Sequence, residues 1–167
     1  MADHAHTEIA TEVLALARAC GLTIGTVESC TGGLVCGALT AIAGSSDVVM
    51  AGLVTYSNEA KTALARVPAQ LVAANGAVSE PVARAMAEGG RTALGVDLAV
   101  SVTGVAGPGG GSDAKPVGLV HFAVASASGV AHREMRFGAL DRTSIRSKSV
   151  TVALQMLRDA IQARPVT

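Results

Sequence analysis

Aromatic side chains are scarce in this chain of 167 residues, which contains one tyrosine, two phenylalanines and no tryptophan. The core must therefore be built from alanine, valine, leucine and isoleucine. Binding of single-stranded nucleic acid by base stacking needs more aromatic side chains than these. Basic and acidic residues number 13 each, so no net positive charge attracts nucleic acid or an anionic membrane. We expect neither partner.

Cysteine is also scarce, and long apolar segments are missing. Cys20, Cys30 and Cys36 form neither an even disulfide set nor a paired metal-binding motif, which favours reduced thiols in a cytoplasmic protein. No run of about 20 apolar residues lacks a helix breaker, so we expect no transmembrane helix. Residues 1–12 lack the basic and apolar segments of a signal peptide. A chain of this length indicates one domain over residues 1–167.

The apolar pattern alternates between helices and strands. The expected helices are 9–20, 32–42, 57–67, a short piece from residue 68, 79–94 and 143–162. The expected strands are 22–27, 48–56, 97–107, and 117–125 with 130–137 as a hairpin. Strands that are apolar on both faces and alternate with helices are typical of a sheet covered on both sides. We predict an α/β fold, a three-layer α/β/α sandwich around a mixed, mainly parallel sheet with a β-hairpin in the C-terminal half.

Three loops follow predicted strands and are rich in functional groups: 28–33, 55–61 and 103–115. In α/β folds, ligands bind at the carboxyl ends of the strands. We therefore expect these three loops to converge on one site.

The first loop, ESCTGG, carries three small side chains with nucleophilic atoms. In one interpretation, Ser29 or Thr31 caps the following helix, which is a common role of these residue types. In the other, a nucleophile lies beside the free backbone N–H groups of the helix start. Cys30 is a conceivable nucleophile, although a buried structural thiol is the commoner role of cysteine. The GxSxG elbow of the standard α/β-hydrolases is absent.

A serine nucleophile needs a base, and the histidines are poorly placed for it. They lie in an N-terminus that we expect to be mobile and in the predicted hairpin: His4, His6, His121 and His132. Lys61, aided by Tyr56, is the best base for Ser29, although a lysine in such a position is usually a solvated charge. It can accept a proton where burial, or the positive end of the helix that begins near Gly32, lowers its pKa.

The third loop, TGVAGPGGGSDAK, is rich in glycine but matches neither the P-loop nor a dinucleotide-binding fingerprint. Glycines let bare backbone approach a ligand closely, whereas the alternative is a flexible surface loop. About ten residues without regular structure in a compact chain favour a function.

Six motifs, in this order, resemble the C-terminal domain of the CinA family: ESCTGGL, VTYSNEAK, GAVSEPVARAMAEG, SVTGVAGPGGG, KPVGLV and DRTSIR. The resemblance runs from about Glu8 to Leu157. This domain also stands alone as nicotinamide-nucleotide amidase. The resemblance implies hydrolysis of nicotinamide mononucleotide to nicotinic acid mononucleotide and ammonia, with no metal or other cofactor, in a compact α/β/α domain that forms homo-oligomers.

The resemblance also implies roles for individual residues. The family's serine nucleophile corresponds to Ser29, and its lysine and tyrosine correspond to Lys61 and Tyr56. The substrate-binding motif and the late arginine motif correspond to Thr103, Gly104, Gly107, Gly109, Gly110, Gly111, Arg142 and Arg146.

Amide cleavage by acyl transfer also needs N–H donors at the developing oxyanion. The backbone of Thr31, Gly32 and Gly33 is the expected source of these donors. The glycine-rich backbone with Arg142 could hold a phosphate. The alternative to an enzyme is a non-catalytic nucleotide-binding or regulatory module of the same fold.

Overall fold

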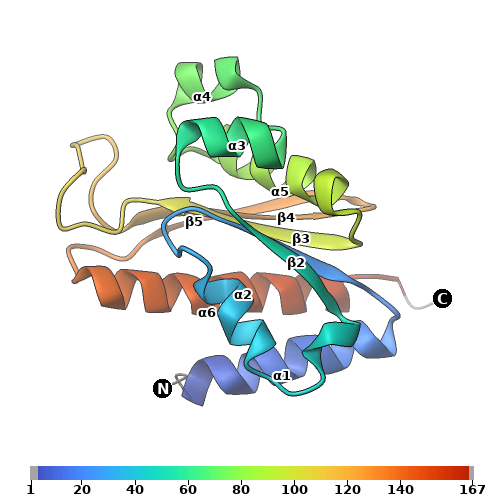
Figure 1. The fold of residues 1–167 in the computed structure, drawn as a ribbon. Helices are drawn as coiled ribbons and strands as arrows, with labels where there is room; N and C mark the ends of the chain where they lie inside the picture. Colours follow the sequence, from blue (N-terminus) through green and yellow to red (C-terminus); the bar gives the residue numbers. More distant parts are fainter. Residues whose placement is uncertain (1–3, 166–167) are drawn as a thin grey trace.

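A five-stranded mixed sheet forms the middle layer of the protein in the computed structural model, which describes residues 4–165 (Figure 1). The strand order is β2-β1-β3-β4-β5. β1 pairs in parallel with β2 and β3, whereas β3, β4 and β5 pair antiparallel. The predicted mixed sheet with its hairpin is therefore confirmed, with the parallel pairs confined to one half of the sheet. The strands are β1 (Ile24–Glu28), β2 (Val49–Val54), β3 (Leu98–Gly104), β4 (Leu119–Ser126) and β5 (Gly129–Arg136).

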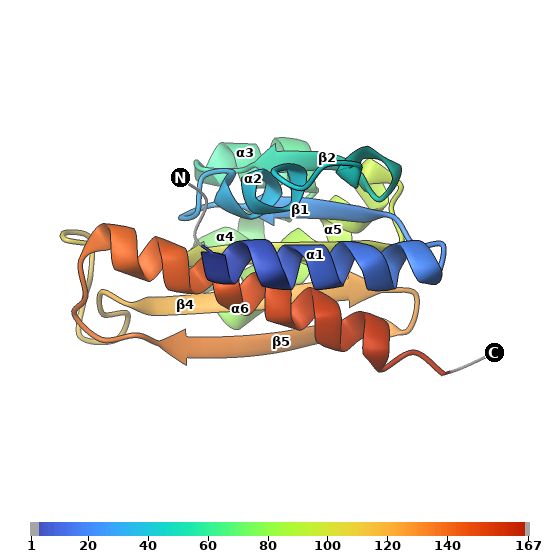
Figure 2. The same ribbon diagram turned by 90° about the horizontal axis from the view of Figure 1, so that it is seen from below.

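Helices cover both faces of this sheet, as predicted. One face carries α1 (His4–Ala19), α2 (Leu34–Thr40) and α6 (Arg142–Gln162), and Figure 2 shows α1 and α6 side by side. The other face carries α3 (Asn58–Ala65), α4 (Ala69–Asn75) and α5 (Glu80–Leu94), and a short 3₁₀ turn (Ser45–Asp47) precedes β2. None of the helices between residues 4 and 165 combines the length and apolar character needed to cross a membrane.

The core is aliphatic on both sides of the sheet. The larger cluster lies between the sheet and α1, α2 and α6, and Phe122 is fully buried in it. On the opposite face, α5 packs closely on β1, because a Cβ at Gly90 would lie 2.2 Å from Cγ2 of Val27. All five residues of β1 are buried. The end of β1, where the first candidate loop begins, is therefore held from both sides.

The helices α3, α5 and α6 each begin after an N-cap residue whose side chain accepts a backbone hydrogen bond. Ser57 accepts a hydrogen bond from the N–H of Ala60 (3.0 Å), and Ser79 accepts one from the N–H of Val82 (3.4 Å). Both caps agree with the start positions expected from the sequence. Asp141 caps α6 through the N–H of Ser144 (2.9 Å), so this helix begins one residue earlier than expected.

Two local expectations were wrong. The second helix begins at Leu34 instead of residue 32, because Gly32 and Gly33 have φ angles of 56° and 99°, outside the helical region. The N-terminal histidines belong to α1 and not to a mobile segment. His6 Nε2 lies 3.0 Å from the carbonyl oxygen of Ser147, which ties the start of α1 to α6.

Candidate functional site

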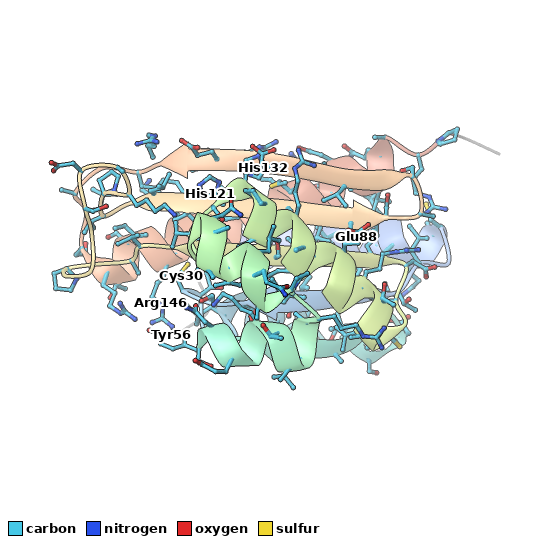
Figure 3. The ribbon with its side chains drawn as sticks, turned by 90° about the horizontal axis from the view of Figure 1, so that it is seen from above. Cys30, Tyr56, Glu88, His121, His132 and Arg146 are labelled. Carbon is cyan, nitrogen blue, oxygen red and sulfur yellow. The ribbon has the colours of Figure 1, made fainter. Side chains whose placement is uncertain are left out.

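The three candidate loops meet at the carboxyl ends of β1, β2 and β3, around a pocket of about 210 Å³. Figure 3 shows Cys30, Tyr56 and Arg146 gathered at this end of the molecule, with His121 and His132 farther across the sheet, on β4 and β5. Six residues expected from the sequence line the pocket: Ser29, Tyr56, Lys61, Thr103, Gly104 and Arg142.

Ser29 and Lys61 are in direct contact. The N–H of Ser29 donates to the carbonyl of Val102 (2.9 Å), which extends the β1–β3 ladder by one residue and fixes the serine at the strand end. Lys61 lies in α3, and its Nζ donates to Oγ of Ser29 (3.2 Å) and to the carbonyl of Thr55 (2.9 Å). The lysine is 1% exposed. The structure therefore brings together the two groups that a lysine-assisted serine nucleophile needs.

Burial lowers the pKa of Lys61 below its ordinary value, because desolvation disfavours the ammonium. Cys30 and Glu59 act in the opposite direction, and Glu59 is exposed to solvent. The N-terminal end of α2, with its partial positive charge, was also expected to lower the pKa of Lys61. This expectation was wrong in one respect. The carboxylate of Glu28 lies at that helix end and offsets its partial charge.

Glu28 caps α2, a role that sequence reasoning missed. Its two carboxylate oxygens accept the N–H groups of Val35 (2.8 Å) and Cys36 (3.0 Å), and the side chain is 1% exposed. Neither Ser29 nor Thr31 caps the helix, so the capping interpretation of this loop is wrong. An acidic residue near a helix start is a known signal, but Glu28 lies seven positions before Val35 and the intervening turn hides it.

Replacing Glu28 with alanine should destabilise the protein, because one buried and one partly buried N–H group lose their charged acceptor. We expect the free energy of unfolding to fall by about 1.5–3 kcal/mol, measured by urea denaturation. Glu28→Gln is the matched control, since its amide oxygen still accepts one N–H, and it should lose less. Equal stability of the alanine variant and the unmodified protein would contradict the capping role.

Cys30 is a poor nucleophile in this position. The residue is 6% exposed and belongs to the larger core cluster. Desolvation raises the pKa of its thiol to about 12, so almost no thiolate exists at neutral pH. The geometry therefore favours Ser29 over Cys30.

Arg142 joins the second and third loops. Its Nη1 donates to the carbonyl of Gly107 (2.9 Å), and its Nη2 donates to the hydroxyl of Tyr56 (3.0 Å). Tyr56 is 61% exposed, and its hydrogen-bond partner is this arginine rather than Lys61 or Ser29. Tyr56 therefore lies at the rim of the pocket and takes no part in the contact between Ser29 and Lys61.

Arg146 is hydrogen-bonded to the backbone of the first loop. Its Nε donates to the carbonyl of Cys30 (3.1 Å), and its Nη2 donates to that of Thr31 (3.2 Å). Two features favour glycine at position 32. A Cβ there would lie 3.2 Å from this same Nη2, and the φ of Gly32 is positive. The late arginine therefore positions the turn that follows Ser29.

One of the three expected oxyanion donors is already used in a hydrogen bond within the loop. The N–H of Gly32 already donates to the carbonyl of Ser29 (3.0 Å). Within residues 4–165, no hydrogen-bond acceptor is found for the N–H of Thr31 or of Gly33. In the same range, the buried hydroxyl of Thr31 also has no hydrogen-bond partner. Thr31 and Gly33 therefore remain candidate donors, whereas Gly32 does not.

The glycine-rich loop contributes less to the pocket than expected. Thr103 lines it and donates its hydroxyl to the carbonyl of Ala77 (2.8 Å). Gly107 does not line the pocket, and its carbonyl accepts the hydrogen bond from Arg142. The other three glycines expected to bind substrate are exposed and do not line the pocket: Gly109, Gly110 and Gly111. These three glycines were expected in the site because the family resemblance implied it, and a glycine run gives no register within a loop by which to choose among them. Three residues that do line the pocket were not expected there: Asn58, Ala77 and Val78.

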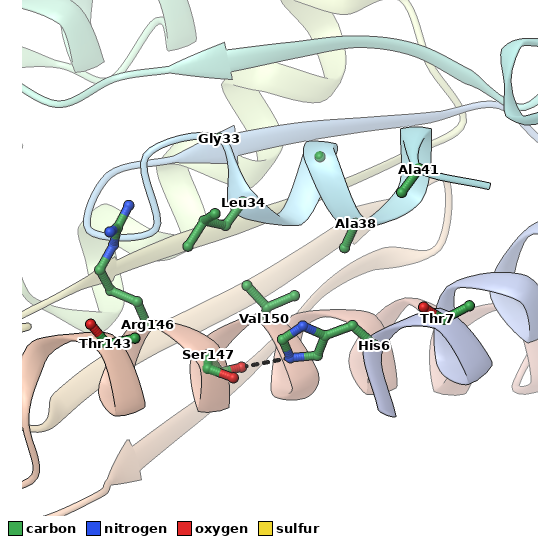
Figure 4. Close-up of a pocket in the computed structure, with 11 residues that line it drawn as sticks. His6, Thr7, Gly33, Leu34, Ala38, Ala41, Thr143, Arg146, Ser147 and Val150 are labelled. Carbon is green, nitrogen blue, oxygen red and sulfur yellow. Dashed lines mark hydrogen bonds between the residues drawn. The ribbon is translucent and has the colours of Figure 1, made fainter. Parts of the chain in front are cut away.

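A larger pocket of about 390 Å³ lies between α2 and the helices α1 and α6 (Figure 4). It is bordered by small and apolar side chains such as Leu34, Ala38 and Val150. Its lining also includes polar residues, among them His6, Arg146 and Ser147. Among the described residues that line it there is no lysine, so a serine–lysine pair of the Ser29–Lys61 kind is found in the smaller pocket. Over the described part of the chain, no group of three or more His, Cys, Asp or Glu side chains could hold a metal ion.

Comparison with known proteins gives one consistent family. The model of the CinA C-terminal domain matches residues 6–161. A CinA-like protein of Synechococcus sp. is 55% identical over 151 residues, covering 90% of this chain and 36% of the relative. A CinA-like protein of Mycolicibacterium gilvum is 53% identical over 141 residues, covering 84% of this chain and 33% of the relative. The chain thus spans about a third of the length of these relatives.

Solved structures agree. The competence/damage inducible protein CihA from Agrobacterium tumefaciens superposes with a TM-score of 0.94 at 47% identity, covering 97% of this chain and 98% of that one. A CinA superfamily protein from Klebsiella pneumoniae gives a TM-score of 0.91 at 34% identity, covering 97% of this chain and 100% of that one. The six motifs, the three-layer fold and these matches lead to one conclusion: the chain belongs to the CinA C-terminal domain family.

Proposed function

We propose that the protein is an amidohydrolase that converts nicotinamide mononucleotide and water to nicotinic acid mononucleotide and ammonia. The observation that carries the proposal is the 3.2 Å contact between Oγ of Ser29 and Nζ of the buried Lys61, in a pocket at the strand ends. A free hydroxyl beside a desolvated amine is suited to acyl transfer.

In the proposed mechanism, the neutral amine of Lys61 takes the proton of Ser29 as Oγ attacks the carboxamide carbon. The negative charge that develops on the carbonyl oxygen is stabilised by backbone N–H donors, for which Thr31 and Gly33 are the candidates. The protonated lysine then gives its proton to the leaving nitrogen, and ammonia departs. Attack of water on the resulting ester, with Lys61 again as base, releases the carboxylate product and restores Ser29.

The direct test is an ammonia-release assay on the purified protein, with nicotinamide mononucleotide, nicotinamide riboside and free nicotinamide as substrates. We expect release from the mononucleotide, with product confirmed as nicotinic acid mononucleotide. Tight binding of the mononucleotide without ammonia release would overturn the proposal and favour the alternative, a non-catalytic nucleotide-binding module of the same fold.

The phosphate of the substrate should contribute strongly to its binding. Arg142 is exposed at the pocket and fixed by Gly107 and Tyr56, so its guanidinium is placed to meet an anionic group. Each charge-assisted hydrogen bond contributes about 1.5–3 kcal/mol, or roughly ten- to a hundredfold in Kd. By calorimetry on the Ser29→Ala protein, which prevents turnover, the riboside should bind at least tenfold more weakly than the mononucleotide.

Arg142→Gln is the companion variant for this experiment. It should weaken binding of the mononucleotide and leave binding of the riboside nearly unchanged, because only the mononucleotide carries the phosphate. Equal affinities for the two ligands in the parent protein would remove the phosphate site from this position.

A further inference from the structure

The larger pocket, between α2 and the helices α1 and α6, is a second concave site, and the described residues that line it differ from those of the pocket at the strand ends. Its volume of about 390 Å³ lies in the range of about 300–1,000 Å³ that is usual for small-molecule sites. Figure 4 shows Arg146 at one end of it, with Leu34, Val150 and Ala38 along its length. The pocket therefore combines a cationic end with an apolar wall.

The guanidinium of Arg146 has donors to spare. Its Nε and Nη2 donate to the carbonyls of Cys30 and Thr31, along one side of the group. Among residues 4–165, these two carbonyls are its hydrogen-bond acceptors, and no carboxylate there forms an ion pair with it. Its Nη1 therefore remains free to donate. A half-buried cation of this kind is stabilised by an anion that meets its charge.

Gly37 leaves the pocket open on its α2 side. It lies inside α2, where glycine is the least favourable residue after proline. The usual reasons for a glycine do not apply to it, because its φ is not positive and a Cβ there would meet no atom within 4 Å. Since Gly37 also lines the pocket, a larger side chain at this position would occupy it. The sequence thus keeps this space empty at a cost to the helix.

These features limit the chemistry of the ligand. Arg146 is the one permanently charged side chain among the described residues that line the pocket, so an anionic group is attracted there and meets no carboxylate. A carboxylate matches the geometry of a guanidinium. The apolar wall suits an aliphatic chain, which leaves water when it packs against Leu34 and Val150. We propose that this pocket binds a small amphipathic carboxylic acid, with its carboxylate on Arg146 and its apolar chain along α2.

The proposed site is connected to the turn that follows Ser29 through the same arginine. Arg146 donates to two carbonyls of that turn, and Gly33, at the end of the turn, lines the larger pocket. A carboxylate on Nη1 would offset the positive charge that the guanidinium presents to these carbonyls. The acid would therefore act on the turn beside Ser29 without entering the pocket at the strand ends.

The test is a titration of the isotope-labelled, unmodified protein with octanoate, followed by the chemical shifts of its amides. We expect saturable binding, with the largest shifts in residues 31–41 and 143–150. Acetate, which lacks the apolar chain, and octan-1-ol, which lacks the charge, should each bind at least tenfold more weakly. Absence of saturable octanoate binding, or equal affinities for octanoate and octan-1-ol, would overturn the proposal.

Gly37→Leu is the variant that fills the pocket. Leucine favours the helix more than glycine does, so the variant should fold, and its side chain should weaken octanoate binding at least tenfold. Gly37→Ala is the matched control, since it adds a Cβ where no atom lies within 4 Å and should bind octanoate nearly as the unmodified protein does. Undiminished binding of octanoate by the folded Gly37→Leu protein would contradict the proposed site.

Arg142→Gln separates this site from the pocket at the strand ends, which is lined by the cations Lys61 and Arg142. The variant should bind octanoate with unchanged affinity and with the same pattern of shifts. If it lost octanoate binding, the acid would be entering the pocket at the strand ends, and the proposal would be wrong. None of these measurements involves ammonia release, so this proposal and the proposed activity can fail independently.

Discussion

Lys61→Arg should reduce kcat for ammonia release by about 10²- to 10⁴-fold, the usual contribution of a general base. The substitution keeps the positive charge, but a guanidinium does not deprotonate in the working range of pH and so cannot accept the proton of Ser29. The measurement is steady-state ammonia release at saturating substrate. Lys148→Arg, at an exposed position of α6, is the control and should have the activity of the unmodified protein. An active Lys61→Arg protein would show that the lysine acts only as a fixed charge.

The pH dependence follows from the same lysine. In the proposed mechanism the active form of Lys61 is the neutral amine, so kcat should rise with pH through the ionisation of Lys61. Burial lowers the pKa of Lys61, which places this rise below the ordinary lysine value of about 10.4. Glu59 acts against burial and raises that pKa, so Glu59→Gln should move the rise to still lower pH. A rise in kcat at or above the ordinary lysine value would contradict the assignment of this ionisation to the buried Lys61.

Ser29→Ala should abolish turnover, with a loss of about 10⁴-fold or more, because it removes the hydroxyl that forms the acyl intermediate in the proposed mechanism. The fold should be retained, since the serine is only half-buried and its hydroxyl bonds Lys61 alone among the described residues. Binding of nicotinamide mononucleotide should therefore remain measurable.

Cys30→Ala is the informative comparison for Ser29→Ala. Its thiol is buried and protonated, so its loss should cost little activity. If Cys30→Ala eliminated ammonia release while Ser29→Ala kept it, the thiol would be the nucleophile and the proposed mechanism would be wrong.

The sequence predicted two features of the molecule well: the layers of the fold and the place of the candidate site at the strand ends. Apolar strands followed by polar loops predicted the three-layer fold, and the rule that ligands bind at strand ends placed Ser29 and Lys61 at one site although 32 residues separate them. That rule needs no side-chain geometry, because parallel pairing of β1 with β2 and β3 brings the strand ends together whatever the loops contain.

The parts that could not be predicted depend on where a loop turns. Glu28 reaches α2 only because the chain reverses over the next five residues, and Arg142 reaches Tyr56 across 86 positions of sequence. Likewise, nothing in a run of glycines says which of them faces the pocket. Gly104 lines the pocket whereas Gly109 does not, and the difference is set by where β3 ends.

The cap formed by Glu28 has a consequence for the cost of reaching the transition state. It joins the last residue of β1 to the first turn of α2, and Arg146 fastens the carbonyl groups in between. Ser29, the nucleophile of the proposed mechanism, therefore lies in a short closed loop whose ends and middle are all fixed in the folded chain. The conformational entropy of this loop is lost when the protein folds and not again in each turnover, so more of the substrate's binding energy remains for lowering the barrier.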